Sequence, residues 1–430
     1  MMILLYTLKS IAFALTEPYF LLVLAILMFT LYRKNKHTVI MQKMIIGEGI
    51  NSSFELTVSQ LVIGIFGGIL ASIIMSYLGI VFDEDSAVDL VFLASIVFMF
   101  FNLRFICFSY SGAILGFLSL VLASSSRIFN ISGLDFLKID VVALMSMVAV
   151  LHFVEGILVM LDGKTGAIPV FSSKNGNIIG GFALQRYWAI PLAVFFMLHD
   201  RSLAGTSWQV SLPQWWPLIN NSIPYDVLKS AVVSLIPFYA VTGYNSVTFT
   251  RDAREKSFLS GGLIILYSAV LFGLAQLAVL SIWLKFLVVI FAPAAHEGII
   301  MLQRHIEVKG TPKYISTDEG IMVLAVAPNS PADEMGIKSG DLLVEINNEE
   351  IRSEDKIAEV IRECSNFIWL KVKKAAGNFE QVSYSKMNGD KKLGIVFVPR
   401  KIPKNSMVVK LDKNRFSDVL DKIKNKDKDD

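Results

Sequence analysis

The sequence has few of the residues on which redox and metal sites usually depend. It contains two cysteines and five histidines in 430 residues. Cys107 lies in an apolar run, and Cys364 lies in the polar C-terminal part. Two cysteines so placed are too few for a disulfide framework or a cysteine-rich zinc site. The sequence therefore argues against redox chemistry as the function.

Charged residues are also scarce. They make up 18% of the chain, against 54% hydrophobic residues, and the mean hydropathy is +0.56. These values lie outside the range of soluble domains, so much of the chain is expected to lie in lipid. The formal net charge is only +3, and the basic residues occur in short loops, which argues against nucleic acid as a partner. The N-terminus lacks a basic n-region and a small-residue cleavage site, so we expect it to be retained.

Familiar catalytic motifs are missing as well. No G-x-S-x-G elbow, Walker sequence or Rossmann glycine pattern occurs. The segment FAPAAHEGIIMLQRHIE, residues 291–307, lacks the H-E-x-x-H of a helical zinc site, because Ile300 stands where the second histidine belongs. His305 lies nine residues after His296, on the opposite face of a helix. The sequence thus predicts no catalytic residue, no metal and no cofactor, and it places His296 and Glu297 at the polar end of the last span.

Two features keep other interpretations open. Leu161-Asp162-Gly163 matches the LDG sequence in which site-2 intramembrane metalloproteases hold a zinc ligand, although those proteases place their histidine motif before it. A degenerate or atypical site-2-type protease therefore remains an alternative. His152 and Glu155 lie three residues apart in an apolar run, where ionisable groups are costly. They mark either a functional site or a hydrogen-bonded pair between packed helices.

Apolar runs long enough to cross a bilayer recur along the first 300 residues. A helical crossing needs about 20 apolar residues, and the last run is long enough for two short crossings with a turn near 273–276. The prediction is a polytopic α-helical membrane domain with eight or nine spans. The expected spans lie near residues 10–31, 57–80, 88–103, 105–123, 140–160, 186–199, 228–249 and 258–293.

Basic residues in the short loops predict the orientation, because cytoplasmic loops keep lysine and arginine. The loop after the first span is basic, whereas the next one, FDEDSAVD, is acidic, so the first is expected inside and the second outside. Two crossings within 258–293 then place the C-terminal domain in the cytoplasm, and the basic flank from Arg304 to Lys309 favours this. A single crossing would instead make the protein an envelope-facing sensor.

A change of composition near residue 307 marks a domain boundary. The segment GIMVLAVAPNSPADEMGIKSGDLLVEINNEEI, residues 320–351, predicts a strand at Ile321–Ala327, a short helix at Ala332–Glu334 and a second strand at Leu342–Ile346. It resembles the core of the bacterial PDZ domain along nearly its whole length. We therefore expect a multi-pass transmembrane domain over 1–306, a small α+β PDZ domain over 307–400 and a charged tail over 401–430.

PDZ domains bind an extended peptide as an added strand beside a sheet edge, with a helix as the other wall. The helix predicted at Glu354–Cys364 supplies the wall, on which Ile357, Val360 and Ile361 share one face. The sequence KKLGIVFVP, residues 391–399, has the Leu-Gly-Ile of a carboxylate-binding loop followed by a strand, which implies a circularly permuted domain. Alternatively, this strand only completes the core and binds nothing. The predicted peptide-binding residues are Leu393, Gly394, Ile395, Val396, Ile357, Val360 and Ile361.

Residues 161–191 carry a further resemblance. They read LDGKTGAIPVFSSKNGNIIGGFALQRYWAIP. The Pro-Val-Phe, Gly-Gly-Phe-x-Leu-Gln-Arg and Trp-x-x-Pro elements, together with the polytopic part and the terminal PDZ core, are similar to the MinJ-type division proteins of Gram-positive bacteria. The resemblance implies a non-catalytic scaffold of the cell membrane that acts in division-site selection or septum organisation. It also implies a cytoplasmic PDZ domain and, besides the lipid bilayer and a peptide or protein segment in the PDZ groove, partners of the DivIVA and MinD types.

Overall fold

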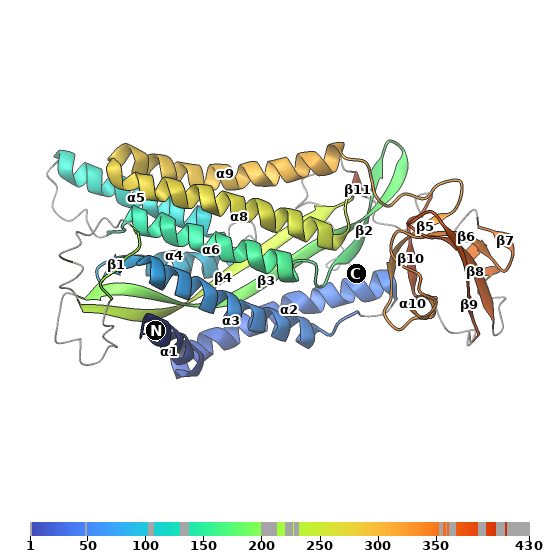
Figure 1. Cartoon of the computed structure of the whole chain (residues 1–430), viewed down its shortest axis with the longest axis horizontal. Helices are drawn as coiled ribbons and strands as arrows, with labels where there is room; N and C mark the ends of the chain where they lie inside the picture. Colours follow the sequence, from blue (N-terminus) through green and yellow to red (C-terminus); the bar gives the residue numbers. More distant parts are fainter. Residues whose placement is uncertain are drawn as a thin grey trace.

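The chain forms a long helical body with a small β domain at one end (Figure 1). Within the body, helices surround a long β-hairpin, and the β domain is built from the last part of the chain. The computed structural model describes residues 2–47, 50–101, 107–129, 137–198, 213–219, 227, 232–351, 356–357, 359–360, 367–385, 393–400 and 409–410.

Several helices of the body begin at residues that cap them well. Ser52 and Asp252 form capping boxes with Glu55 and Glu255, and Asp140 caps a third helix through its side chain. The helices are α1 (Met2–Thr16), α2 (Pro18–Ile46), α3 (Ser53–Leu78), α4 (Asp89–Phe101), α5 (Phe108–Phe129), α6 (Val141–Asp162), α8 (Ala253–Leu277) and α9 (Ile282–Lys309), with the 3-10 turn η4 (Ala278–Leu280) between the last two.

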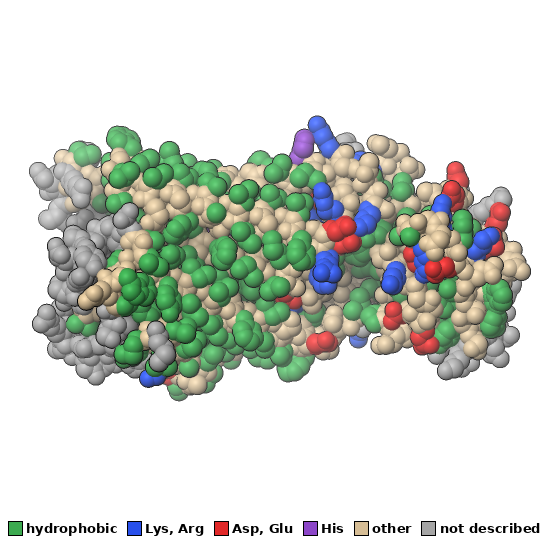
Figure 2. Space-filling view, viewed as in Figure 1, with side chains coloured by type: hydrophobic (Ala, Val, Ile, Leu, Met, Phe, Trp, Pro, Cys, Tyr) green, Lys and Arg blue, Asp and Glu red, His purple; other side chains and the backbone are tan. Residues whose placement is uncertain are grey.

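Five helices in the described residues are long and apolar enough to cross a membrane: α3, α5 up to Ser126, α6, α8 with η4, and α9. A sixth crossing results if α1 and α2, which meet at 70°, count as one bent span. Large hydrophobic side chains are exposed over the body, and charged side chains gather where the body meets the β domain (Figure 2). The part of the chain that the structure describes thus contains five or six candidate helical spans, and the predicted eight or nine are not confirmed.

The segments predicted as helical spans at 186–199 and 228–249 are β-strands, so these two predictions are wrong. β3 (Asn177–Leu198) and β4 (Val232–Thr248) pair in antiparallel fashion over the whole length of β4. Both strands are rich in β-branched and aromatic residues, and side chains on both faces are largely buried among the helices. A strand buried on both faces reads as one continuous apolar run, which periodicity cannot distinguish from a buried helix.

Three short strands extend this hairpin into a five-stranded sheet of order β1-β3-β2-β11, with β4 on β3. β1 (Val81–Asp83) runs parallel to β3 at the end of the body away from the β domain, and β2 (Ile168–Lys174) runs antiparallel to β3 at the other end. β11 (Val409–Lys410) pairs with β2. Two residues of the predicted charged tail thus join the sheet, and the rest of 401–430 lies outside the described residues.

Between β1 and β2, helix α3 covers the edge of β3. Gly64 and Gly68 of α3 lie directly on the strand: a Cβ at these positions would stand 2.1 Å and 2.0 Å from the carbonyl oxygens of Ala189 and Pro191. One turn further along α3, Ser72 Oγ accepts a hydrogen bond of 2.9 Å from a β3 backbone N–H. The helix therefore shields backbone groups that an apolar surrounding would leave without partners.

The last apolar stretch, 258–293, folds as two antiparallel helices, α8 and α9, as expected for two crossings. The turn between them is η4, a few residues later than the predicted 273–276. Ser260 near the start of α8 bonds Gln303 near the end of α9 at 2.6 Å. The β domain that follows α9 therefore lies at the same end of the body as the start of α8 (Figure 1).

Helix α4 is shorter than the span predicted at 88–103. Its 13 residues cover about 20 Å, which is less than the roughly 30 Å of a bilayer core. The following helix, α5, begins directly after Cys107, whose Sγ lies 3.0 Å from Nε2 of His152 in the middle of α6. The helix predicted at 105–123 therefore starts halfway along the body and not at its end.

The β domain is a six-stranded antiparallel sheet of order β10-β5-β6-β8-β9, with β7 on β6. The predicted strand, short helix and second strand are confirmed as β5, α10 and β6. The elements are β5 (Ile321–Val326), α10 (Pro331–Glu334), β6 (Leu342–Ile346), β7 (Glu349–Glu350), β8 (Ile368–Lys373), β9 (Phe379–Tyr384) and β10 (Ile395–Phe397).

The β domain packs directly on the hairpin formed by β2 and β3. The Gly180 N–H donates to the Tyr314 carbonyl at 2.9 Å, and the Phe182 ring meets the Tyr314 ring edge-on at 5.6 Å. A Cβ at Gly180 would stand 2.8 Å from the Val398 side chain. Buried residues of the two parts belong to one continuous apolar cluster. The domain is thus fixed to the body and is not tethered by a loose linker.

Candidate functional site

The predicted peptide edge lies at one side of the C-terminal sheet. β10 pairs with β5 along one edge, and none of the described strands pairs with its other edge. The C-terminal end of α2 lies beside β10 (Figure 1). β10 therefore offers backbone groups to which an extended peptide can add, next to the body of the protein.

Gly394 gives the segment before β10 the shape of a binding loop. Its φ is 77°, in the left-handed region, and a Cβ there would stand 2.3 Å from the Cβ of Ser330. The Gly394 carbonyl accepts the Ala327 N–H at 2.7 Å, and the Leu393 carbonyl accepts the Ala332 N–H at 3.1 Å. Among the described residues, the N–H groups of Leu393 and Gly394 have no backbone acceptor. Such N–H groups are suited to bind a peptide carboxylate.

The side chains predicted to line the groove divide between two faces of the sheet. Leu393 is buried in the core of the β domain together with Ile357 and Val360 from the predicted wall helix, and the half-buried Ile395 packs against them. These four residues thus belong to one apolar cluster. Ile361 lies outside the described residues. The role of all of them in peptide binding stays a prediction.

Val396 lies on the other face of β10. Successive residues of a strand point to opposite faces, and Val396 belongs to the apolar cluster shared with the hairpin. Phe397, which the sequence analysis did not select, packs on the same side as Ile395. Strict alternation along β10 would have selected Phe397 in place of Val396.

An ion-pair group holds the segment between α9 and β5. Lys313 donates to Asp252 at 3.2 Å and to Glu255 at 2.8 Å. Burial by itself raises the pKa of the Asp252 carboxyl, but hydrogen bonds from the Glu255 N–H and from Lys313 lower this pKa below its usual value. Burial also raises the pKa of the neighbouring Tyr314 hydroxyl. Near neutral pH the group is therefore charged, and it links the β domain to the start of α8.

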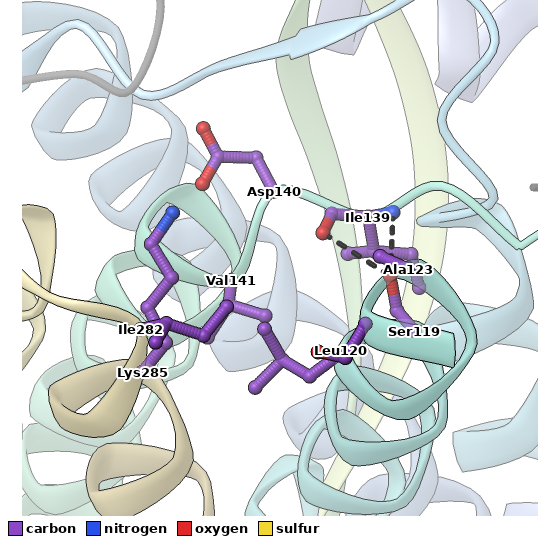
Figure 3. Close-up of a pocket in the computed structure, with 9 residues that line it drawn as sticks. Ser119, Leu120, Ala123, Ile139, Asp140, Val141, Ile282 and Lys285 are labelled. Carbon is purple, nitrogen blue, oxygen red and sulfur yellow. Dashed lines mark hydrogen bonds between the residues drawn. The ribbon is translucent and has the colours of Figure 1, made fainter. Parts of the chain in front are cut away.

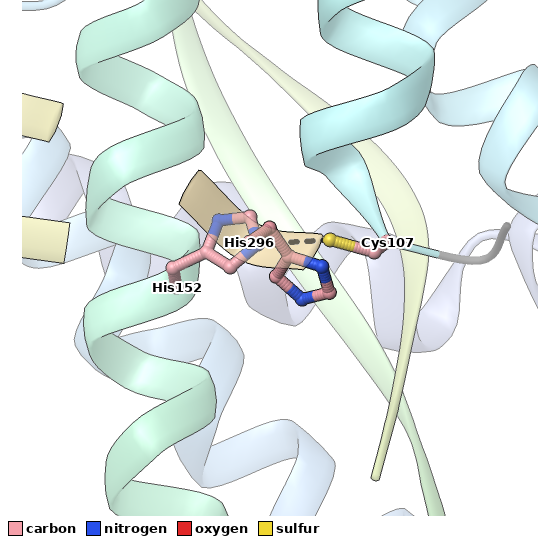
Figure 4. Close-up of side chains that lie close together, drawn as sticks. All are labelled: Cys107, His152 and His296. Carbon is pink, nitrogen blue, oxygen red and sulfur yellow. Dashed lines mark hydrogen bonds between the residues drawn. The ribbon is translucent and has the colours of Figure 1, made fainter. Parts of the chain in front are cut away.

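A second cluster, formed by Cys107, His152 and His296, lies in the middle of the helical body (Figure 4). Cys107 Sγ is 3.0 Å from His152 Nε2, and one donor atom from each of the three residues lies within 4.8 Å of the others. Ser109 Oγ lies 3.0 Å from the same nitrogen and 2.7 Å from the Tyr267 hydroxyl. One thiol and two imidazoles are ligands that Zn²⁺ and copper prefer.

Sequence analysis missed this cluster because it placed His296 at the end of the last span. α9 continues to Lys309, so His296 lies in the middle of the helix, with its ring centroid 5.7 Å from that of His152. Glu297 is likewise inside the body, where it accepts a hydrogen bond from the Tyr110 hydroxyl. The available signal was the rarity of ionisable side chains inside apolar runs. That Cys107, His152 and His296 lie together depends on how the helices pack, which the local hydrophobic pattern of the sequence does not specify.

His152 and Glu155 do not act as an isolated pair. His152 belongs to the central cluster, whereas Glu155 accepts a hydrogen bond of 2.7 Å from Thr242 on β4. Glu155 is only 4% exposed. Both residues therefore connect α6 to neighbouring elements, and each has its own partners.

Asp162 of the LDG sequence belongs to a different site. Its carboxylate accepts hydrogen bonds from Arg186 at 2.6 Å and 2.8 Å and from the Trp188 indole at 2.9 Å. Ten residues of helix, about 15 Å, separate it from His152. Asp162 and His296 therefore do not come together as ligands of one metal, and the site-2 protease arrangement finds no support in the described residues.

A pocket of about 310 Å³ opens at the end of the body away from the β domain (Figure 3). Its two charged residues are Asp140, which caps α6, and Lys285 of α9. Ser119 bonds the Ile139 N–H at 3.1 Å across the pocket wall. The Asp140 side chain is thus occupied in holding the helix start, and we assign no function to this pocket.

Comparison with known proteins agrees with the assignment of the C-terminal domain. The PDZ domain family matches residues 322–368. The cell division topological determinant MinJ of Bacillus subtilis is 23% identical to this chain over 259 residues. The chain is MinJ-like and contains a PDZ domain. The match covers 56% of this chain and 60% of MinJ, so it spans less than two thirds of that relative.

One solved structure is also similar to the PDZ part. It is the PDZ domain of an SdrC-like protein from Listeria monocytogenes, with 23% identity and a TM-score of 0.18. The alignment covers 19% of this chain and 92% of that domain. In this MinJ-like chain, the PDZ assignment therefore rests on the family match together with the order of β5, α10 and β6.

Proposed function

We propose that this protein is a non-catalytic, multi-pass membrane scaffold that binds partner proteins through its PDZ domain in cell division. The observation that carries the proposal is the position of the domain. It is packed on the end of a body whose surface is largely hydrophobic (Figure 2). None of the described strands pairs with the outer edge of its strand β10. The similarity to MinJ, which is named for its role in division topology, supports the cellular process.

The rigid attachment suits a scaffold. Gly180, Phe182 and Tyr314 join the PDZ domain to the hairpin inside the body, so the proposed peptide edge would keep a fixed position relative to the membrane. A partner that binds there would be oriented relative to the membrane. Because no flexible linker has to become ordered, binding would carry no additional cost in conformational entropy. By the resemblance to MinJ-type proteins, proteins of the DivIVA and MinD types are the proposed partners. This role requires no catalytic residue.

The proposed location is the cell membrane, with the PDZ domain on the cytoplasmic side. Lys164, Lys174, Arg251 and Lys309 lie at the end of the body that carries the PDZ domain, whereas Lys138 and Lys285 lie at the opposite end. The acidic loop after α3 lies at the opposite end. Cytoplasmic segments keep lysine and arginine, so the charges favour this orientation.

A single cysteine in place of Asp430 tests the orientation. In a Cys364→Ser background, an impermeant maleimide is expected to leave this cysteine unlabelled in intact cells and to label it after permeabilisation. The parent protein with Cys107 alone serves as control for background labelling, because that thiol lies inside the body. Labelling in intact cells would place the PDZ domain outside and remove the adaptor function.

The substitution Ile395→Asp tests the peptide edge. Ile395 is half-buried beside the proposed groove, and burying an isoleucine side chain is worth about 1.5–3 kcal/mol. Loss of about 1.4 kcal/mol weakens binding tenfold. We therefore expect at least a tenfold lower capture of DivIVA-type and MinD-type proteins in pull-downs, and misplaced septa in cells that carry the variant.

Phe379→Asp is the matched control, because Phe379 is 56% exposed on β9, at the opposite edge of the same sheet. It is expected to leave capture and septum placement unchanged. Equal capture by the Ile395→Asp variant would refute binding at β10. Normal septum placement in a clean deletion of the whole gene would refute the proposed role in division.

A further inference from the structure

We propose that Cys107, His152 and His296 bind one transition-metal ion in the middle of the helical body, with Zn²⁺ as the first candidate. The scaffold function does not use this site. The metal site and the scaffold function are therefore independent proposals, and each can be correct without the other. The three residues come from the start of α5, the middle of α6 and the middle of α9. An ion bound there would join three helices that are distant in sequence (Figure 4).

The donor atoms are close enough for one ion. They lie within 4.8 Å of one another, and Cys107 Sγ is 3.0 Å from His152 Nε2. Bond lengths of about 2.3 Å to sulfur and 2.0–2.1 Å to nitrogen place these two atoms about 3.6 Å apart in a tetrahedral zinc site. A shift of roughly half an ångström at the Cys107 side chain therefore accommodates the ion, with one position left for a fourth ligand.

The hydrogen bond on the far side of His152 orients the ring for metal binding. His152 Nδ1 lies 2.7 Å from the Val148 carbonyl oxygen, which can only accept, so Nδ1 carries the proton. In the neutral ring, which a metal requires, the lone pair is then on Nε2, the nitrogen that faces Cys107. A histidine that binds a metal typically donates its other N–H to a backbone carbonyl or carboxylate in this way.

His296 supplies a second imidazole, which hydrogen-bonds to Cys107. Its Nδ1 is buried and makes no hydrogen bond in the described part of the chain. A buried polar nitrogen left unpaired costs free energy. The ring lies between His152, at 5.7 Å, and Tyr267, at 6.0 Å between centroids, so it is held facing the cluster. Coordination of this ring would give the buried imidazole a bonding role.

Charge balance also favours a divalent ion. A buried Zn²⁺ needs compensating negative charge. The Cys107 thiolate would supply one charge, and Glu155, one turn along α6 from His152, would supply the second once a bound cation draws it into its ionised form. Glu155 bonds Thr242 and therefore balances the charge without binding the ion directly. Because the donors are sulfur and nitrogen, Ca²⁺ and Mg²⁺, which require oxygen ligands, are not expected.

Metal analysis of the full-length protein tests the site. The protein is purified in detergent with a tag free of histidine and without chelators. We expect about one zinc per chain in the wild type and in the His305→Ala control, and less than a tenth of that in Cys107→Ser and His152→Ala. His305 is an exposed histidine on the same helix, α9, and is thus a matched control.

Two further measurements separate metal loss from misfolding. Co²⁺ in place of zinc is expected to give thiolate-to-metal absorption in the wild type and none in Cys107→Ser. A zinc chelator is expected to lower the midpoint of thermal unfolding of the wild type and to leave that of Cys107→Ser unchanged. One copper per chain with the same dependence on these residues would support the site with a different ion. A wild type without stoichiometric zinc or copper, or equal metal content in Cys107→Ser, would overturn the proposal.

Discussion

Replacement of Gly68 by leucine is expected to prevent helix α3 from packing on strand β3. Even the Cβ of such a residue would stand 2.0 Å from the Pro191 carbonyl oxygen and 3.0 Å from its carbonyl carbon. The obstacle is backbone, which cannot move aside like a flexible side chain. Overpacking of a core usually costs about 1–3 kcal/mol and at times more. Here the helix must separate from the strand, so we expect a loss at or above the upper end of that range.

The separation also exposes backbone groups of β3. Ser72 now accepts a β3 N–H at 2.9 Å, and this bond would be lost as α3 moves away. In an apolar surrounding each unpaired backbone group costs further free energy. The effect is measured as the midpoint of thermal unfolding of the detergent-purified protein and as its yield from membranes.

Gly273→Leu is the control for a glycine in a helix of the same body. A Cβ at Gly273 of α8 meets no atom within 4 Å, and removing a glycine from a helix interior gains about 1 kcal/mol of helix propensity. This variant is expected to be as stable as the wild type or more so. A Gly68→Leu protein that unfolds with the wild type would contradict the close packing of α3 on β3.

The second large effect is expected from Asp162→Leu. Asp162 and Arg186 are 3% and 1% exposed, and removing the carboxylate leaves the buried guanidinium without its negatively charged partner. Breaking one partner of a buried ion pair costs about 3–5 kcal/mol. The Trp188 indole also loses its acceptor. We expect a correspondingly less stable protein in thermal or denaturant unfolding.

The double variant Asp162→Leu with Arg186→Met distinguishes lost pairing from lost packing. Replacing both charges by apolar groups of similar volume is often neutral, so the double variant is expected to be more stable than Asp162→Leu alone. Lys373→Met, which breaks an exposed pair with Glu319, is the control and should cost less than about 1 kcal/mol. Simple additivity of the two single substitutions would show that Asp162 and Arg186 are not coupled.

This ion pair also joins two separate parts of the 161–191 segment. Asp162 of the LDG sequence and Arg186 of the Gly-Gly-Phe-x-Leu-Gln-Arg element meet across the start of the hairpin, and Trp188 joins them. From the sequence alone, Asp162 of LDG is a possible zinc ligand of a site-2-type protease. The structure gives it a different partner, and the motif holds α6 to β3.

The sequence by itself determined the features that depend on local pattern. Long apolar runs specified α3, α6, α8 and α9, because a helix that faces lipid needs about 20 apolar residues whatever its neighbours are. The PDZ strands β5 and β6 and the helix α10 followed from alternation and from the turn residues around them. The folding of 258–293 into two helices followed from its length.

Only the tertiary structure decided which elements meet. β3 and β4 are strands because helices cover both of their faces, and a run of apolar residues does not reveal whether helices or lipid will surround it. Cys107, His152 and His296 form a cluster because α5 starts halfway along the body and α9 extends to Lys309. Val396 faces the hairpin because the PDZ domain packs there. Each of these outcomes depends on contacts between residues far apart in the chain, which local periodicity does not encode.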